Sequence, residues 1–198
     1  MLKTYSQNKE DLFILNYFGK LRGNLLEIGS NNGVDLSNSK LLIEHGFSAT
    51  LVEPGTTFDQ LEKLYKDNPK ITLHNHAIGK QPGTMTFYES NAHIKGGSDR
   101  GLVSTLDYNE TLKWRKSGVQ FTERIVDVKP YDLTDKFDFI SIDAESKDWE
   151  ILQQIDLTYT KCLCIEWNSD TDLYRLFTDY CKGFKVAVKN AENLIFTR

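Results

Sequence analysis

The sequence predicts an α/β fold, in which a mostly parallel, twisted sheet carries helices on both faces and ends in an antiparallel strand. Short apolar runs alternate along the chain with segments whose apolar residues recur every three or four positions. That alternation is typical of parallel strands joined by helices. With 198 residues, of which 39% are hydrophobic and 26% charged, the chain suits one packed domain. Since it shows neither repeats nor a linker, we expect a single domain over residues 1–198.

The first half of the chain alternates most clearly. Leu12 and Leu15 lie on one face of a helix that follows polar capping residues. An apolar strand then ends at a glycine-rich turn, and Gly46 suits the C-terminal cap of the next helix. Phe58 and Leu61 are the first apolar residues of a further segment with helical spacing. We therefore expect, in order, helix 8–18, strand 24–28, helix 35–44, strand 49–52, helix 57–65 and strand 71–78.

The second half contains an interruption at about 90–118, where Gly96, Gly97 and Gly101 and polar turns break the rhythm around a helix at 106–116. Because functional loops are carried on rigid scaffolds, we expect this insertion to close over a ligand. Around it we expect strands 85–88, 121–128, 137–142 and 161–167, helices 147–155 and 173–181, and a final antiparallel pair, 184–188 with 194–197.

The glycine-rich turn after strand 24–28 is the first candidate for ligand binding, because α/β sheets bind ligands beyond the carboxyl ends of their strands. Gly29 and Gly33 frame this turn and would let the backbone approach a ligand. The following helix would offer free N–H groups to a carboxylate. A dinucleotide fingerprint requires glycine at position 31, where this chain has Asn31. The turn therefore favours a ligand with an adenosine and an amino-acid tail but no phosphates.

Acidic and polar residues at neighbouring strand ends fit the same ligand. Glu27 could meet an ammonium group, directly or through water, and Glu53 could bind both ribose hydroxyls. The plain alternative for each is a solvated charge at a strand end. Asn75, His76 and Ala77 would flank the adenine, although small polar strand ends are common without such a role.

A second group of acids follows the later strands. Asp143 and Glu145 end strand 137–142, and Glu166 ends the next one. Carboxylates placed together repel unless a proton or cation lies between them. The group suits a general base for a hydroxyl, a site for a polyhydroxylated substrate, or a divalent cation, and the metal is not determined by the sequence. Asp148 and Glu150 are explained by the dipole of their helix, and His93 is a less favoured base.

Charge and composition restrict the partners. A net charge of -4 argues against nucleic acid. The N-terminus lacks the apolar core of a signal peptide, no run is long enough for a membrane helix, and three cysteines do not form a disulfide framework. We expect a cytoplasmic protein without a membrane partner. The sequence is equally consistent with one domain of a larger multidomain chain.

These residues together resemble the FkbM-type methyltransferases, a family of class I enzymes with a Rossmann-like fold that use S-adenosylmethionine. The matching pieces are Tyr5-Ser6-Gln7, Glu10-Asp11, Glu27-Ile28-Gly29, Ser37-Asn38, Val52-Glu53-Pro54, Ala77-Ile78-Gly79, Ser104-Thr105-Leu106, Ser141-Ile142-Asp143-Ala144-Glu145, Glu166 and Asn168. The family usually has glycine where this chain has Ser146, and alanine or glycine where it has Ser30. Both replacements are small.

The resemblance implies an O-methyltransferase that acts on a hydroxyl of a sugar or glycan, with Asp143 as base or metal ligand and with Glu145 and Glu166 orienting the acceptor. It implies that S-adenosylmethionine is bound by Ser6, Gln7, Glu27, Gly29, Ser30, Asn31, Gly33, Asn38, Glu53, Pro54, Asn75, His76, Ala77 and Asp143.

Four alternatives remain open: a methyltransferase of another small hydroxylated metabolite, a non-catalytic S-adenosylmethionine-binding module, a dinucleotide-dependent oxidoreductase, and an amine or nucleic-acid methyltransferase. The missing glycine at position 31 disfavours the oxidoreductase. No Asn/Asp-Pro-Pro-Tyr-like motif follows strand 137–142, which disfavours the last.

Overall fold

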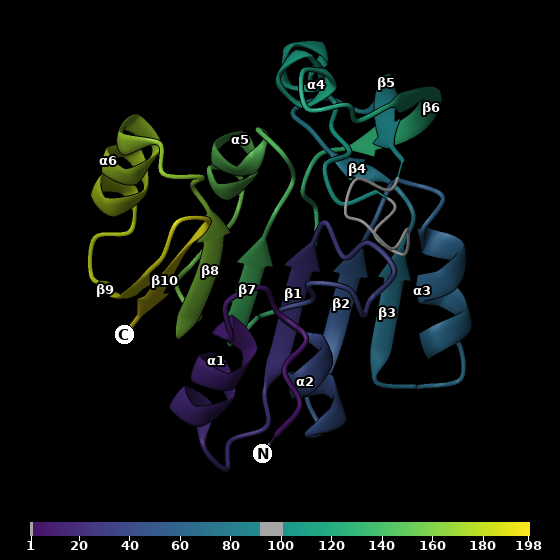
Figure 1. Ribbon diagram of the computed structural model, residues 1–198. Helices are drawn as coiled ribbons and strands as arrows, with labels where there is room; N and C mark the ends of the chain where they lie inside the picture. Colours follow the sequence, from purple (N-terminus) through teal and green to yellow (C-terminus); the bar gives the residue numbers. More distant parts are fainter. Residues whose placement is uncertain (1, 92–100) are drawn as a thin grey trace.

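A seven-stranded sheet in the order β3-β2-β1-β7-β8-β10-β9 forms the centre of the molecule (Figure 1). The computed structural model describes residues 2–91 and 101–198. Strands β3, β2, β1, β7 and β8 are parallel, and β10 is antiparallel to both β8 and β9. This confirms the predicted mostly parallel sheet with an antiparallel end. The strands are β1 (Asn24–Ile28), β2 (Ser48–Val52), β3 (Ile71–His74), β7 (Phe139–Ile142), β8 (Cys162–Glu166), β9 (Lys185–Lys189) and β10 (Asn193–Thr197).

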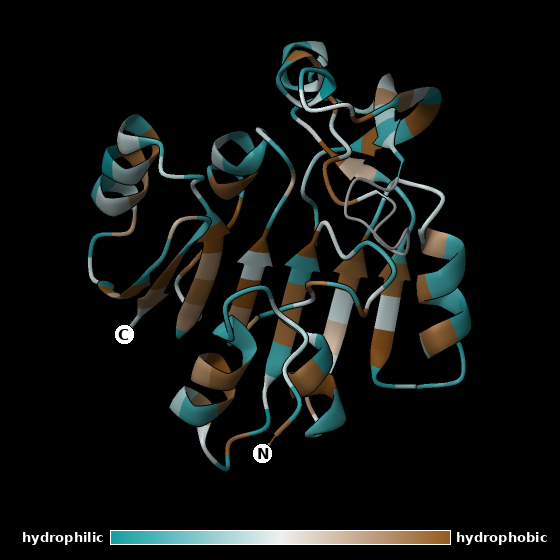
Figure 2. Cartoon of the chain, viewed as in Figure 1, coloured by the Kyte–Doolittle hydropathy of each residue, from teal (hydrophilic) through white to brown (hydrophobic). Residues whose placement is uncertain are grey.

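Helices cover both faces of this sheet, as predicted. On one face, α1 (Glu10–Phe18), α2 (Lys40–Glu44) and α3 (Phe58–Tyr65) pack on residues such as Leu25 and Leu51. On the other, α5 (Asp148–Leu152) and α6 (Thr171–Tyr180) pack on residues such as Leu26 and Ile140. The two sets alternate along each strand because successive side chains point to opposite faces. Figure 2 shows the central strands mostly in hydrophobic colours, while the helices also carry hydrophilic segments.

A smaller sheet, in the order β4-β6-β5, lies beyond the carboxyl ends of the central strands (Figure 1). It consists of β4 (Ala77–Ile78), β5 (Gly83–Ser90) and β6 (Phe121–Lys129), and α4 (Tyr108–Arg115) lies in the connection between β5 and β6. The prediction of one strand over 71–78 is therefore wrong. Asn75 turns away from the main sheet and donates from Nδ2 to the Glu53 carbonyl, 2.8 Å away, and the next residues pair with β6 instead.

The helix after the glycine-rich turn is also shorter than predicted, since α2 begins at Lys40 rather than near residue 35. The cause is Glu27, whose carboxylate accepts hydrogen bonds from the backbone N–H groups of Asn38 (3.0 Å) and Ser39 (3.2 Å). Residues 30–39 consequently form turns around a buried carboxylate. The anion that we expected at the start of this helix is thus supplied by the protein itself.

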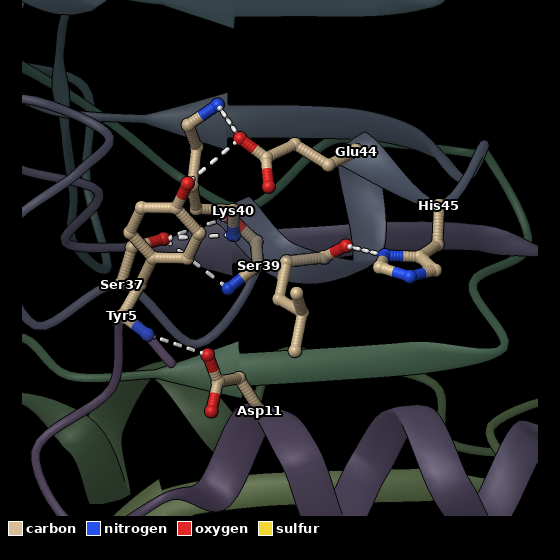
Figure 3. Close-up of polar contacts among 8 residues, drawn as sticks. Tyr5, Asp11, Ser37, Ser39, Lys40, Glu44 and His45 are labelled. Carbon is tan, nitrogen blue, oxygen red and sulfur yellow. Dashed lines mark hydrogen bonds and ion pairs between the residues drawn. The ribbon is translucent and has the colours of Figure 1, made fainter. Parts of the chain in front are cut away.

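The N-terminal segment is bound to α1 and α2 by polar contacts (Figure 3). The Tyr5 backbone N–H donates to Asp11 Oδ2 at 2.7 Å, and the Tyr5 hydroxyl donates to Glu44 Oε1 at 2.8 Å. Glu44 is also paired with Lys40 at 2.7 Å. These contacts join the segment to α1 and α2, so that the residues following Tyr5 lie over the sheet.

All three cysteines are free and buried. Cys162 and Cys164 lie on β8 beneath the α1–α3 face, and Cys181 follows α6 on the other face. No helix within the described ranges is both long enough and apolar enough to span a membrane.

Candidate active site

A cavity of about 320 Å³ opens beyond the carboxyl ends of β1, β2 and β7. This is the point where the strand order reverses, with β1 between β2 and β7, and it is where α/β sheets bind ligands. The cavity is within the range typical of small-molecule sites. Every residue that the sequence suggested for the cofactor or for catalysis lines it, except Ser6, Gly33 and Asn75.

Those three residues have other surroundings. The Ser6 hydroxyl donates to Asp11 Oδ1 at 2.9 Å, so it helps to bind the N-terminal segment to α1. The neighbouring Gln7 lines the cavity. Asn75 supports the backbone of Glu53. A Cβ on Gly33 would lie 2.5 Å from Leu61 Cδ1, so this glycine allows the turn to pack on α3 rather than to approach a ligand.

Gly29 lines the cavity, and a second, steric reason requires glycine at this position. Its φ is +85°, a left-handed conformation that favours glycine, and a Cβ there would lie 1.7 Å from the carbonyl oxygen of Asp143. Its backbone N–H donates to the Val52 carbonyl at 3.0 Å. Gly29 therefore lets the ends of β1, β2 and β7 come together around the cavity.

Glu53 is positioned by two backbone N–H groups, with Oε1 accepting from Gly55 at 2.6 Å and Oε2 from Asn31 at 2.9 Å. Each oxygen keeps a lone pair for a further donor. Burial raises the pKa of Glu53 to about 7, although the two N–H groups act against this. The carboxylate is therefore held in place at the wall of the cavity and can accept hydrogen bonds from hydroxyl groups.

Glu27 also lines the cavity, but it is occupied by its own loop. Besides the two backbone donors, Ser39 Oγ donates to Oε2 at 2.6 Å and Ser37 Oγ lies 3.3 Å from the same oxygen. Burial raises the pKa of Glu27 to about 7 despite these hydrogen bonds. Its clearest structural effect is to hold residues 37–39 at the floor of the cavity.

Two buried asparagines of the cavity wall have side-chain atoms without a hydrogen-bond partner among the described residues. These atoms are Asn31 Oδ1 and Nδ2 and Asn38 Oδ1. Asn38 is anchored through Nδ2, which donates to Ser141 Oγ at 3.1 Å. Because buried polar groups are usually paired, these atoms indicate positions where a polar ligand can bind.

Asp143, Glu145 and Glu166 come together at one end of the cavity, as predicted. One carboxylate oxygen of each can be chosen so that all three lie within 4.8 Å of one another. Glu145 is buried, Glu166 is half-buried and Asp143 is exposed to the cavity.

Mutual repulsion adds to desolvation in this group. Desolvation and the charges of Asp148 and Glu27 raise the pKa of Asp143 to about 8. Because Asp143 is open to the solvent of the cavity, repulsion by these neighbours is an important part of the shift. Burial, together with Asp143, raises the pKa of both Glu145 and Glu166. The group therefore has a strong tendency to bind a proton or a cation.

Asp148 also belongs to this region. From the sequence we attributed it to the dipole of its helix alone, but the structure gives it a further role. It is 3% exposed, and its Oδ1 accepts from the Ala144 N–H at 2.9 Å. It thereby closes the turn that carries Glu145, and burial raises its own pKa to about 6. The sequence contains no local signal for this role, because Asp148 lies six residues beyond Ile142, the last residue of β7, and only the folded turn brings it to the Ala144 N–H.

The same turn contains two consecutive left-handed residues, Glu145 at φ 45° and Ser146 at φ 78°. Such a conformation costs a non-glycine residue about 1 kcal/mol. The family that this sequence resembles usually has glycine at the position of Ser146. The left-handed conformation of this residue explains that preference for glycine. The turn in this chain must therefore be held by contacts.

The described part of the insertion, residues 101–118, supplies another wall. Leu102, Val103, Leu106 and Trp114 line the cavity, together with Phe87 of β5. The sequence indicated the segment but not these side chains. His93, the alternative base, lies outside the described residues.

The charge of the cavity is strongly unbalanced. Of the charged residues lining it within the described ranges, seven are acidic and Lys147 is the only lysine or arginine. His76 also lines it, and burial and Lys129 lower the pKa of His76, which favours the neutral imidazole. The cavity therefore suits a cationic ligand better than an anionic one.

Comparison with protein families gives a match to the methyltransferase FkbM domain over residues 27–178. This range extends from Glu27 of the cavity to α6. No curated protein matches the chain.

Solved structures of methyltransferases share the fold. A Pyrococcus horikoshii protein described as an RNA methyltransferase has a TM-score of 0.53 at 11% identity, covering 100% of this chain and 90% of that one. The ribosomal protein L11 methylase of Lactobacillus delbrueckii subsp. bulgaricus has the same TM-score and identity, with coverages of 96% and 77%. A Methanococcus maripaludis protein described as an S-adenosylmethionine-dependent methyltransferase has a TM-score of 0.52 at 11% identity, with coverages of 95% and 83%. At this identity the likeness shows the fold alone.

Proposed function

The chain belongs to the FkbM methyltransferase domain family, and on that premise we propose that it moves a methyl group from S-adenosylmethionine to a hydroxyl of a sugar or glycan. Methyl transfer from S-adenosylmethionine follows from the family. The choice of oxygen as the acceptor atom, and of a saccharide as its carrier, is our proposal. The observation that carries it is the convergence of Asp143, Glu145 and Glu166 at one end of the cavity.

The residues of the cavity fit the cofactor. Glu53 offers free lone pairs to the two ribose hydroxyls, and Asn31 can both donate and accept beside it. Asn38 Oδ1 can accept from the ammonium group while Glu27 holds its loop. Ile78, Phe87 and Val103 give an apolar wall for adenine.

S-adenosylmethionine supplies an activated methyl group on a positively charged sulfur. The acidic lining favours this charge, and the protein's own task is to orient and deprotonate the acceptor. In our proposal, a carboxylate oxygen of Asp143 accepts the hydroxyl proton. Glu145 and Glu166 accept hydrogen bonds from further hydroxyls and so hold the acceptor in position.

A second role for the same acids is the binding of a divalent cation, because three carboxylates within reach of one another suit a hard metal ion. Removing metal with EDTA distinguishes the roles. If Asp143 acts as a base, turnover is unchanged by EDTA. If a metal is needed, turnover is lost and returns with Mg²⁺ or Mn²⁺, and the base assignment is wrong.

Neutral, polyhydroxylated acceptors are favoured over nucleic acid by charge. The chain carries a net charge of -4 and its cavity has an excess of acids, which would repel a phosphate backbone. We propose that it acts in the cytoplasm, without a membrane partner, alone or as part of a longer chain.

The proposal is tested in two stages. Thermal shift with S-adenosylhomocysteine and with NAD tests the cofactor, and stabilisation by NAD alone would contradict it. Methyl transfer from isotopically labelled S-adenosylmethionine to a panel of sugars, glycans, small alcohols, amines and RNA then tests the acceptor. Labelling of an alcohol but no sugar points to another hydroxylated metabolite, and labelling of amines or RNA alone overturns the proposal. Binding without any transfer supports a non-catalytic module.

A further inference from the structure

Thr105 connects the insertion to the turn that carries Glu145. It is fully buried, and its Oγ1 donates to the carbonyl oxygen of Glu145 at 2.8 Å. The same Oγ1 accepts from the N–H of Asp107 at 2.9 Å. Since a hydroxyl has one proton, and the Asp107 N–H already occupies the oxygen as an acceptor, that proton is directed to Glu145.

The backbone of Thr105 is itself fixed. Its N–H donates to the Tyr88 carbonyl at 3.1 Å, and the Tyr88 N–H donates back to the Thr105 carbonyl at 2.9 Å. Nearby, Ser104 Oγ accepts from the Ser90 N–H at 3.0 Å. Thr105 is therefore an extension of the small sheet, and its hydroxyl joins that sheet to the end of β7.

The residue at the other end of this hydrogen bond needs support. Glu145 and Ser146 both have positive φ values, 45° and 78°, and non-glycine residues keep such conformations only where the surroundings determine them. Asp148 closes the turn from the side of α5, through the Ala144 N–H. Thr105 holds the same turn from the insertion, through the carbonyl of Glu145.

We propose that Thr105 is a positioning residue, whose hydroxyl fixes the backbone of Glu145 and so places the Glu145 carboxylate beside Asp143 and Glu166. The inference rests on the proposed function for its effect on turnover. Its geometric part, that the Thr105 hydroxyl determines the conformation of Glu145, stands independently of the acceptor.

The test compares three variants of the full chain. Thr105→Val keeps the shape of the side chain but removes the hydroxyl, and Thr105→Ser restores it. Thr111→Val is the matched control. Thr111 is also fully buried in the insertion and donates to a backbone carbonyl, that of Tyr108 at 2.7 Å, but it is not bonded to Glu145.

For Thr105→Val we expect kcat to fall by about tenfold to a hundredfold, as a misplaced catalytic group does. The affinity for S-adenosylhomocysteine should stay within about threefold, because the hydrogen bonds of Glu53 and Asn38 are unaffected. Thr105→Ser and Thr111→Val should both keep the wild-type kcat, the latter even if its melting temperature falls as far as that of Thr105→Val. Equal losses of kcat in Thr105→Val and Thr111→Val would show a merely structural role.

Crystal structures of Thr105→Val and the wild type give a readout that needs no acceptor. We expect Glu145 to leave its left-handed conformation, or its carboxylate to move away from Asp143, in the variant. An unchanged Glu145 overturns the inference, whatever the activity. If the wild type transfers no methyl group to any acceptor, the proposed function fails, and the crystal structures alone decide the role of Thr105.

Discussion

A carboxyl group that takes a proton from a hydroxyl must reach it, and its surroundings must make it basic enough. Asp143 lies at the end of β7 and opens into the cavity. Desolvation, together with the charges of Asp148 and Glu27, raises its pKa to about 8, whereas Glu145 and Glu166 are more enclosed. Of the three acids, Asp143 is therefore the one best placed to meet an incoming acceptor.

Asp143→Asn should lower the rate of methyl transfer by about 10² to 10⁴, since a general base contributes about that much. The melting temperature should stay the same or rise, because one repelling charge is removed from the cluster. Turnover is measured with labelled cofactor, and binding with S-adenosylhomocysteine by calorimetry. Asp59→Asn, on the exposed surface of α3, serves as the control. Full turnover by Asp143→Asn would refute the assignment.

At the scale of elements, the glycine-rich turn joins three strand ends. Gly29→Ala should destabilise the protein by more than about 3 kcal/mol, because it adds both an unfavourable φ and a collision with the Asp143 carbonyl. Gly183→Ala is the matched comparison, since Gly183 has φ +97° but no atom within 4 Å of the added Cβ. That change should cost only about 1 kcal/mol. Urea unfolding measures both, and equal losses would mean that the collision relaxes.

The sequence predicted the strands of the sheet better than the segments at the edge of the cavity. The apolar runs that end at Ile28 and Ile142 define strands because they are buried on both faces. Residues 35–39 have helical spacing, but the Glu27 carboxylate competes for their N–H groups. Such competition depends on a contact between distant residues, which periodicity does not contain.

The candidate site, too, could be predicted from the sequence only in part. Acids at strand ends, such as Glu53 and Glu166, could be predicted because parallel strands end at one edge of the sheet. The roles of Asp148 and Thr105 could not, because each depends on how one turn meets another element. The side-chain amide of Asn31, which has no hydrogen-bond partner among the residues that the structure describes, can also be recognised only once the fold has enclosed it.

For the whole molecule, the collection of acids at one edge makes stability depend on pH. The folded-state pKa of Glu27 and of Glu53 is about 7, against 4.5 for an unperturbed glutamate. Each group binds its proton more tightly in the folded state. Its stabilising contribution is therefore present below pH 4.5 and is lost as the pH rises through 7. Glu10 and Glu89, whose pKa values are lowered, act in the opposite direction and at lower pH.

The free energy of unfolding of the ligand-free protein should consequently fall between pH 5 and pH 8, by about 3 kcal/mol for Glu53 alone. Glu53→Gln should remove that part of the slope, because glutamine does not titrate. Urea unfolding at several pH values measures both proteins. Glu62→Gln, at an exposed position of α3, should leave the slope as it is. A wild-type stability that rises over this range would contradict the expectation.

Because the three cysteines are buried, their reaction with a thiol reagent can be used to measure local opening of the folded protein. A thiol reagent can reach Cys162 or Cys164 only when the helices leave the face of β8, and the rate of modification then measures how often the folded chain opens. Cys164 lies beneath Asn38, whose Nδ2 approaches its sulfur at 3.7 Å. A compound that binds the cavity floor should slow the modification of this thiol in proportion to its occupancy. Ligands can thus be ranked by protection kinetics before any acceptor is known.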